Sequence, residues 1–112
     1  MSMDLEQGLR VTELYCAKRV APELRDQIRI ECARRGKSIT ITEDRPPWHP
    51  DDTEWSSVKV AQLRRDPDSG DWTLHCSDSN GRWWLYDDVA PADTVAPLLV
   101  AIDEDRTGIF WG

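Results

Sequence analysis

Apolar and polar residues alternate through the middle of the chain, and this pattern predicts three β-strands, over residues 58–63, 72–76 and 83–86. Alternation with a period of two is typical of a strand that has one buried face. Two turn signals separate the strands: residues 66–70 read Asp-Pro-Asp-Ser-Gly, and residues 77–81 end in Asn-Gly. Turns of this kind join antiparallel strands. The sequence therefore predicts an antiparallel meander that is rich in tryptophan.

A second region of alternation predicts a hairpin that pairs residues 26–34 with residues 37–45. Isoleucine and cysteine occupy every second position of its first half, and Gly36 lies where the chain would turn. The alternative is a helix over residues 22–35 with Pro22 in its first turn. We favour the hairpin, because it explains both the alternation and the glycine.

Two segments have the 3.6-residue period of amphipathic helices, residues 4–20 and 94–104. Asp4 and Gln7 are spaced as a capping box, in which each side chain accepts a backbone N–H at the start of the helix. Pro22 disfavours helical geometry in the residue before it. The first helix should therefore end close to residue 20.

The second helix has several start signals. Asp93 or Thr94 can provide its N-cap. Pro97 falls in its first turn, where a missing N–H costs little. Beyond this helix, residues 106–112 contain Ile-Phe-Trp. This tail is too apolar to remain in water, and we expect it to pack back on the sheet.

Together these elements predict one α+β domain over residues 1–112. An N-terminal helix precedes an antiparallel meander of about five strands, and a C-terminal helix packs on one face of the sheet. Residues 46–52 contain three prolines and should form a stiff crossing between the hairpin and the tryptophan-rich meander at 55–87. A chain of 112 residues is long enough to bury a core.

Charge is unevenly distributed along this acidic chain, whose net charge is −7. Residues 66–105 contain ten acidic residues and a single cation, Arg82. A nucleic-acid groove needs clustered cations, so nucleic-acid binding is disfavoured. No apolar run is long enough to span a membrane, and the N-terminus lacks the pattern of a secretory signal. We expect a cytoplasmic protein.

The cysteines and histidines give no metal or redox motif. Cys16, Cys32 and Cys76 are widely spaced and form no C-x-x-C pair, so we expect buried, reduced thiols. His75 precedes Cys76, but neighbouring strand residues point to opposite faces. His49 is the other histidine, and the two lack a third metal ligand at a recognisable spacing. We expect no cofactor and no metal.

Six tryptophans are many for a chain of this length. Burying an indole removes about 150–250 Å² from water, so most of them should fill the core. Trp83 and Trp84 are neighbours, however, and must point to opposite faces of a strand. If one fills the core, the other needs a cover or a ligand. An indole beside Arg45, Arg64 or Arg82 would suit stacking on a planar or extended partner.

Two charged groups are candidates for structural or functional roles. Glu43 and Arg45 are two residues apart on a predicted strand, which favours a structural ion pair that Arg64 could join. Residues 103–105, Asp-Glu-Asp, end the last helix, where the helix dipole disfavours negative charge. We expect a compensating arginine, such as Arg106, or a cation there.

Four blocks of sequence, in order, resemble a family of uncharacterised bacterial proteins, domain of unknown function 3024. The blocks are Tyr-Cys-Ala-Lys-Arg at 15–19 with Pro22; Glu-Asp-Arg-Pro-Pro-Trp at 43–48 with Val-Ala-Gln at 60–62; Trp72 with Asp78, Asn80, Arg82, Trp83 and Tyr86; and Ile-Asp-Glu-Asp at 102–105 with Phe-Trp-Gly at 110–112. The resemblance covers nearly the whole chain, and it implies no activity, cofactor or catalytic residue. Residues 81–86, Gly-Arg-Trp-Trp-Leu-Tyr, also look like the central strand of the WW peptide-binding module, whose closing Trp-x-x-Pro is absent here.

The function we predict is a non-enzymatic binding or interaction module. The exposed side of its sheet would offer aromatic and arginine side chains to a peptide, a protein or a small planar ligand. The alternative is a small hydrolase-like enzyme that uses Glu43 or Asp78 as its acid/base group, with a cation near residues 103–105. The candidate binding residues are Glu43, Arg45, Trp48, Arg64, Asp78, Arg82, Trp84 and Tyr86.

Overall fold

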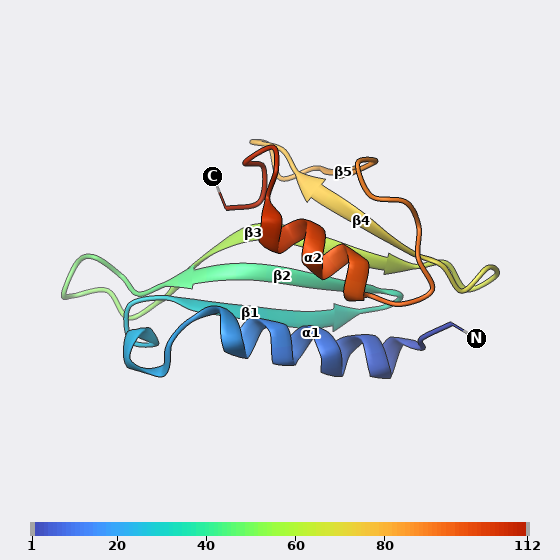
Figure 1. The fold of residues 1–112 in the computed structure, drawn as a ribbon. Helices are drawn as coiled ribbons and strands as arrows, with labels where there is room; N and C mark the ends of the chain where they lie inside the picture. Colours follow the sequence, from blue (N-terminus) through green and yellow to red (C-terminus); the bar gives the residue numbers. More distant parts are fainter. Residues whose placement is uncertain (1, 112) are drawn as a thin grey trace.

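The computed structural model describes residues 2–111, which form one five-stranded antiparallel sheet and two α-helices (Figure 1). The strands lie in the sheet in the order β1-β2-β3-β4-β5, which is their order along the chain. The predicted α+β meander is confirmed. The elements are α1 (Leu5–Arg19), a 3₁₀ turn (Pro22–Leu24), β1 (Arg29–Arg35), β2 (Ser38–Arg45), β3 (Ser56–Arg65), β4 (Trp72–Ser77), β5 (Trp83–Leu85) and α2 (Ala96–Glu104).

The hairpin interpretation of the first half is correct. β1 and β2 pair from Arg29–Asp44 to Arg35–Ser38, which leaves a two-residue turn at Gly36. Gly36 has a φ of 61°, a conformation that glycine adopts without strain. Pro22 opens only the short 3₁₀ turn, so the alternative helix over residues 22–35 is wrong.

Helix α1 begins and ends where its sequence signals predict. The Asp4 side chain accepts the N–H of Gln7 at 2.8 Å, and the Gln7 side chain accepts the N–H of Asp4 at 3.1 Å. Val20 is already extended, with a φ of −121° and a ψ of 129°. This capping box fixes where α1 starts beside the sheet.

A β-bulge in β3 changes which residues share a face of the sheet. Ile41 pairs with Ala61, but the next residue, Thr42, pairs with Lys59, so Val60 is an extra residue in the ladder. Val60 and Ala61 are both buried. A strict period of two would put these neighbours on opposite faces, and the bulge turns both toward the core.

The core lies on one side of the sheet, between the sheet and the two helices. Figure 1 shows α2 lying across one face and α1 running along the β1 edge. Buried residues of both helices form one cluster with alternate residues of the strands. The fully buried side chains include Thr12 of α1, Leu98 and Ile102 of α2, and Ile39, Ile41, Leu63, Trp72 and Leu74 of the sheet.

Helix α2 starts later than predicted. Its N-cap is Val95, and no side chain caps it, so the prediction of Asp93 or Thr94 as the cap is wrong. The preceding residues are held on the sheet, because Ala92 and Trp72 exchange backbone hydrogen bonds of 2.6 and 3.0 Å. The carbonyl of Asp93 also accepts the N–H of Met3 at 2.7 Å. These bonds keep the chain extended up to the start of the helix.

The C-terminal tail packs back on the domain. Phe110 is buried, and its ring lies 5.0 Å from that of Tyr86. The indole N–H of Trp111 donates to the carbonyl of Ile102 at 3.0 Å, which fills an acceptor at the end of α2.

Within residues 2–111, neither helix has the length and apolar character needed to cross a membrane.

Candidate binding face of the sheet

One face of the sheet is left uncovered by both helices. Ile39, Leu63 and Leu74 pair across β2, β3 and β4 and face the core. The residues between them in sequence therefore project from the opposite side, which we call the open face. Its charged, hydrogen-bonding and aromatic members include Arg29, Glu31, Arg35, Thr40, Asp44, Lys59, Gln62, Arg64, Thr73, His75 and Trp83.

The centre of the open face is a chain of hydrogen-bonded side chains on β2 and β3. Gln62 donates to the Thr40 hydroxyl at 3.0 Å, and the Arg64 guanidinium donates to the Gln62 carbonyl oxygen at 2.6 Å. All three residues are half-buried. Bonds to both neighbours fix the Gln62 amide, so the face presents an ordered polar surface.

On β4 the polar chain continues through a histidine. His75 is only 9% exposed, and its Nε2 lies 2.9 Å from the Thr73 hydroxyl. Burial, with a smaller contribution from the Arg64 charge, lowers the pKa of His75 from 6.5 to about 4. At neutral pH the imidazole is uncharged, so it serves as a hydrogen-bonding group on this face.

Two tryptophans lie on the open face toward the start of β3, and each lies beside a cation. The Arg29 guanidinium lies 3.9 Å from the centre of the Trp55 ring, and the Lys59 ammonium lies 5.6 Å from that of Trp83. Both indoles are half-buried. Cation–π contacts of this kind hold an indole in place while part of its surface faces solvent. The open face thus carries two oriented aromatic surfaces.

The open face is more positive than the rest of the molecule. Its strand residues carry four cations, Arg29, Arg35, Lys59 and Arg64, on a chain whose net charge is −7. The carboxylates on the open face of these strands are Glu31 and Asp44. Burial and a hydrogen bond to Asp44 raise the pKa of Glu31, so Glu31 holds its negative charge less readily than an isolated carboxylate.

The structure does not bring the eight predicted binding residues together. Glu43 and Arg45 form the predicted ion pair, at 2.6 Å, but they lie on the helix side of the sheet. Arg64 lies on the open face and pairs with Gln62, so the prediction that it joins this ion pair is wrong. The separation arises because Arg64 faces Ser38, at the other end of β2.

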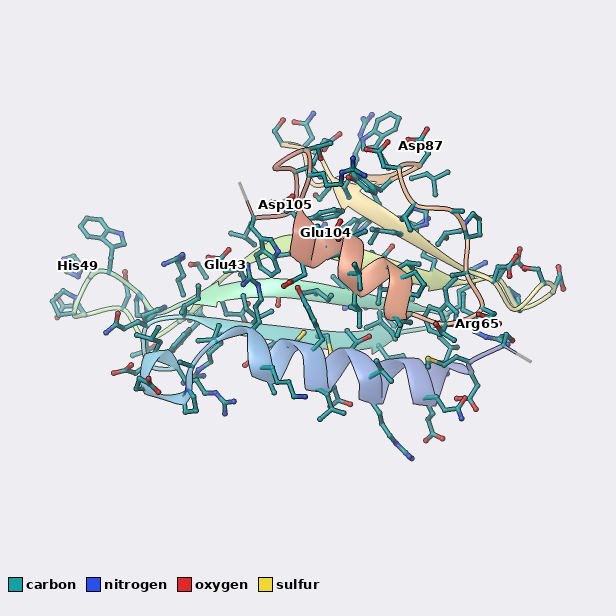
Figure 2. The ribbon with its side chains drawn as sticks, in the orientation of Figure 1. Glu43, His49, Arg65, Asp87, Glu104 and Asp105 are labelled. Atoms are coloured by element: carbon teal, nitrogen blue, oxygen red, sulfur yellow. The ribbon has the colours of Figure 1, made fainter. Side chains whose placement is uncertain are left out.

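Trp48 lies outside both faces, in the loop between β2 and β3. Its side chain is 94% exposed and contacts His49 edge-on. Figure 2 shows His49 at the far end of this loop, well beyond the labelled Glu43. Trp48 is therefore remote from the hydrogen-bonded centre of the open face.

Asp78, Arg82 and Trp84 are brought together at the turn between β4 and β5. Asp78 accepts the indole N–H of Trp84 at 2.8 Å and the backbone N–H groups of Asn80 and Arg82 at 2.9 Å. These bonds, that from Trp84 above all, hold the pKa of Asp78 below its ordinary value. The ionised carboxylate therefore holds the turn together through these three hydrogen bonds.

Trp83 and Trp84 point to opposite faces, as predicted, but neither fills the core. Trp84 pairs with Cys76 on the helix side and is 56% exposed. β5 is a short edge strand, and the indole remains open to solvent. Tyr86 takes the core position instead and is buried against Phe110. Tyr86 is thus unavailable to a ligand.

An arginine compensates the acidic end of α2, as predicted, but it is Arg19 of α1 and not Arg106. Asp103 lies 3.9 Å from Arg19 and accepts the Tyr15 hydroxyl at 3.1 Å. Asp105 accepts the backbone N–H groups of Phe110 and Trp111. Figure 2 shows Asp105 at the end of α2, where it turns the chain into the tail.

The sequence model of one protein family, described as a domain of unknown function (DUF3024), matches residues 3–112. The chain belongs to this family. No curated protein and no solved structure matches it. For this DUF3024 chain, a candidate function must therefore be argued from its own geometry.

Most of the DUF3024 open face was missing from the predicted site. Arg29, Trp55, Lys59, Gln62 and His75 had no role assigned. The alternation of residues in β3 and β4 predicts that Gln62 and His75 share a face. Which face the helices leave open depends on packing, and the bulge at Val60 reverses the assignment for Lys59.

Among residues 2–111, no group of three or more acidic, histidine or cysteine side chains is placed to hold a metal ion.

Proposed function

We propose that this DUF3024 domain is a non-enzymatic binding module, and that its open face binds an extended, weakly acidic peptide segment of a partner protein. The observation that carries the proposal is the pair of oriented indoles, Trp55 and Trp83, next to an ordered polar centre on the open face. Each indole lies beside a cation on an uncovered sheet. A surface of this kind provides rigid aromatic contact area together with hydrogen-bonding groups, the combination that peptide-binding surfaces use.

The spacing of the two indoles favours an extended partner. Trp55 directly precedes β3, and Lys59, which contacts Trp83, lies four residues further along. Four residues of strand span about 13 Å, and Trp83 itself lies on β5, two strands from β3, so the indoles are separated both along and across the sheet. An extended peptide that crosses the sheet obliquely could contact both indoles with different side chains. A small planar ligand would engage only one of them.

Charge favours a partner with a few carboxylates. Arg35 and Arg64 lie on the open face with Arg29 and Lys59, and the remainder of the chain is strongly acidic. A peptide with scattered acidic residues gains from the local cations. A polyanion such as single-stranded nucleic acid would meet only four cations and would be repelled by the net charge of −7.

The enzyme alternative has less support. A general acid needs a carboxyl group with a raised pKa, but the hydrogen bonds from Trp84 and the turn lower that of Asp78. Glu43 is held by Arg45 at 2.6 Å.

Of the eight residues first predicted, we retain Arg64 in the central site. The turn of Asp78 and Trp84 is proposed only as a flanking contact. The proposed setting is the cytoplasm of a bacterium.

Selection from a display library of random 12-residue peptides tests the proposal. We expect the selected peptides to combine aromatic and acidic residues. Their binding to the ¹⁵N-labelled chain should shift the amide resonances of β3 and β4, and the indole resonances of Trp55 and Trp83. Lys59→Glu/Arg64→Glu should weaken binding at least tenfold, because two attractive charges become repulsive. Arg10→Glu/Arg106→Glu makes the same charge change at exposed residues outside the open face and should leave affinity within about twofold.

Three results would contradict the proposal. The first is a set of selected peptides whose resonance shifts map to the helix side. The second is tighter binding of a labelled oligothymidylate than of the selected peptide. The third is a thermal shift caused by a single nucleotide or metabolite, with no peptide selected.

A further inference from the structure

We propose that Cys16 and Cys32 form a dithiol site, at which a peroxide introduces a reversible disulfide that joins α1 to β1. This inference is independent of the proposed peptide binding. It concerns the edge of the sheet, where α1 packs along β1.

The two thiols come from facing elements and line one groove. Cys16 belongs to the buried stripe of α1, and Cys32 lies on the helix side of β1, opposite Ile41. Both side chains line the same groove between α1 and β1. All three cysteines are free, so no existing disulfide competes for this pair. Two thiols that approach each other from packed, facing elements are placed to be joined by a disulfide.

A groove gives a small oxidant access to the pair. It has a volume of about 580 Å³ and lies beside β1, and both cysteines line it. Cys16 is 4% exposed, whereas Cys32 is only partly buried. Cys32 is therefore the sulfur that an incoming molecule meets first. Cys76 differs, because it is buried and its Sγ lies 3.6 Å from the Trp84 carbonyl oxygen.

Exposure to the groove sets which sulfur reacts. Cys32 is partly exposed, whereas Cys16 is buried. The neighbouring Cys16 also lowers the pKa of Cys32. Glu13, Glu31, Arg25 and Arg29 line the same groove, so charges of both signs surround the pair. Cys32 is thus the nucleophile, and Cys16 is the resolving thiol.

The chemistry balances with hydrogen peroxide as the oxidant. The Cys32 thiolate attacks one peroxide oxygen, an S–O bond forms, the O–O bond breaks, and hydroxide leaves. Cys32 becomes a sulfenic acid, and the hydroxide takes up a proton to give water. The Cys16 sulfur then attacks the Cys32 sulfur, forms the S–S bond and expels the oxygen as a second water. Two thiols and one peroxide therefore give one disulfide and two waters, and a small dithiol reverses the change.

The test uses the full chain treated with hydrogen peroxide, blocked with N-ethylmaleimide and digested with trypsin. The expected product is a disulfide between residues 11–18, Val-Thr-Glu-Leu-Tyr-Cys-Ala-Lys, and residues 30–34, Ile-Glu-Cys-Ala-Arg. The intact mass should fall by two hydrogens, and the thiol count should fall from three to one. Cys76→Ser is the matched control and should keep the cross-link.

Two variants test the order of attack. In Cys16→Ala, dimedone should trap a sulfenic acid on Cys32 in monomeric protein. In Cys32→Ala, Cys16 should remain reduced under the same conditions. The proposal fails if the wild-type chain keeps all three thiols, if Cys76 enters the disulfide, or if Cys16 is oxidised as fast without Cys32 as with it. The wild-type mass and thiol count decide the main point even if a variant does not fold.

Discussion

Gly8 of α1 lies directly against the indole of Trp72. A Cβ atom at Gly8 would sit 2.6 Å from two ring carbons of Trp72 and 3.4 Å from a methyl group of Val95. Trp72 is fully buried, and its indole N–H donates to the Met3 carbonyl at 2.9 Å. Packing and this hydrogen bond hold the ring in place, so α1 can approach the sheet this closely only with glycine at position 8.

The contact predicts that Gly8→Ala destabilises the protein. Alanine should favour an isolated helix by about 1 kcal/mol. Overpacking a fixed core costs about 1–3 kcal/mol, and here it should win, giving a net loss of about 1–2 kcal/mol. Urea denaturation measures the change. In Gly8→Ala/Trp72→Phe the smaller ring should make room for the methyl group, so the double variant should lose less stability than the sum of the single variants. If the stability losses of the two single variants simply add, the contact between position 8 and the Trp72 ring is not the cause of the loss in Gly8→Ala.

The role of Gly8 illustrates what the sequence can and cannot predict. Periodicity and capping placed α1 correctly, but they assigned Gly8 only a small cost to the helix. The close approach to Trp72 depends on residues 64 positions apart, which no local pattern records. The same holds for the site. Alternation predicts which residues of one strand share a face, as it did for Glu43 and Arg45. It does not predict that both helices cover the same side, or that a bulge at Val60 brings Lys59 to the open face beside Trp83.

The lowered pKa of His75 predicts a loss of stability in mild acid. Its pKa is about 4 in the folded chain and 6.5 ordinarily, so the unfolded chain binds the proton more readily between these values. The free energy of unfolding should fall as the pH drops from 6.5 to 4, by up to roughly 3 kcal/mol from this residue. His75→Gln lacks this titration. The difference in free energy of unfolding between the wild type and His75→Gln should therefore be smaller at pH 4.5 than at pH 7.5. His49→Gln, in the exposed loop, is the matched control, and an equal effect there would contradict the assignment.

The hydrogen bonds of Asp105 predict that this residue holds the C-terminal tail in place. It has a left-handed φ of 45°, and its carboxylate accepts the N–H groups of Phe110 and Trp111 at 3.0 and 2.9 Å. Asp105→Ala loses both bonds and keeps a strained backbone, so it should cost about 2–3 kcal/mol. Asp105→Gly loses the same bonds without the strain and should cost about 1 kcal/mol less. Urea denaturation followed by tryptophan fluorescence measures both. Equal losses would show that the backbone conformation contributes nothing.

Asp78 makes the corresponding prediction for the turn between β4 and β5. Its carboxylate accepts three hydrogen bonds, so Asp78→Ala should let the turn open locally and speed amide exchange at Asn80 and Arg82 by roughly tenfold. Trp84→Phe removes only the bond from the indole and should have a smaller effect. Asp87→Ala removes an exposed carboxylate just beyond β5 and should leave both amides unchanged (Figure 2). If Asp78→Ala leaves exchange at both amides unchanged, the backbone alone holds the turn.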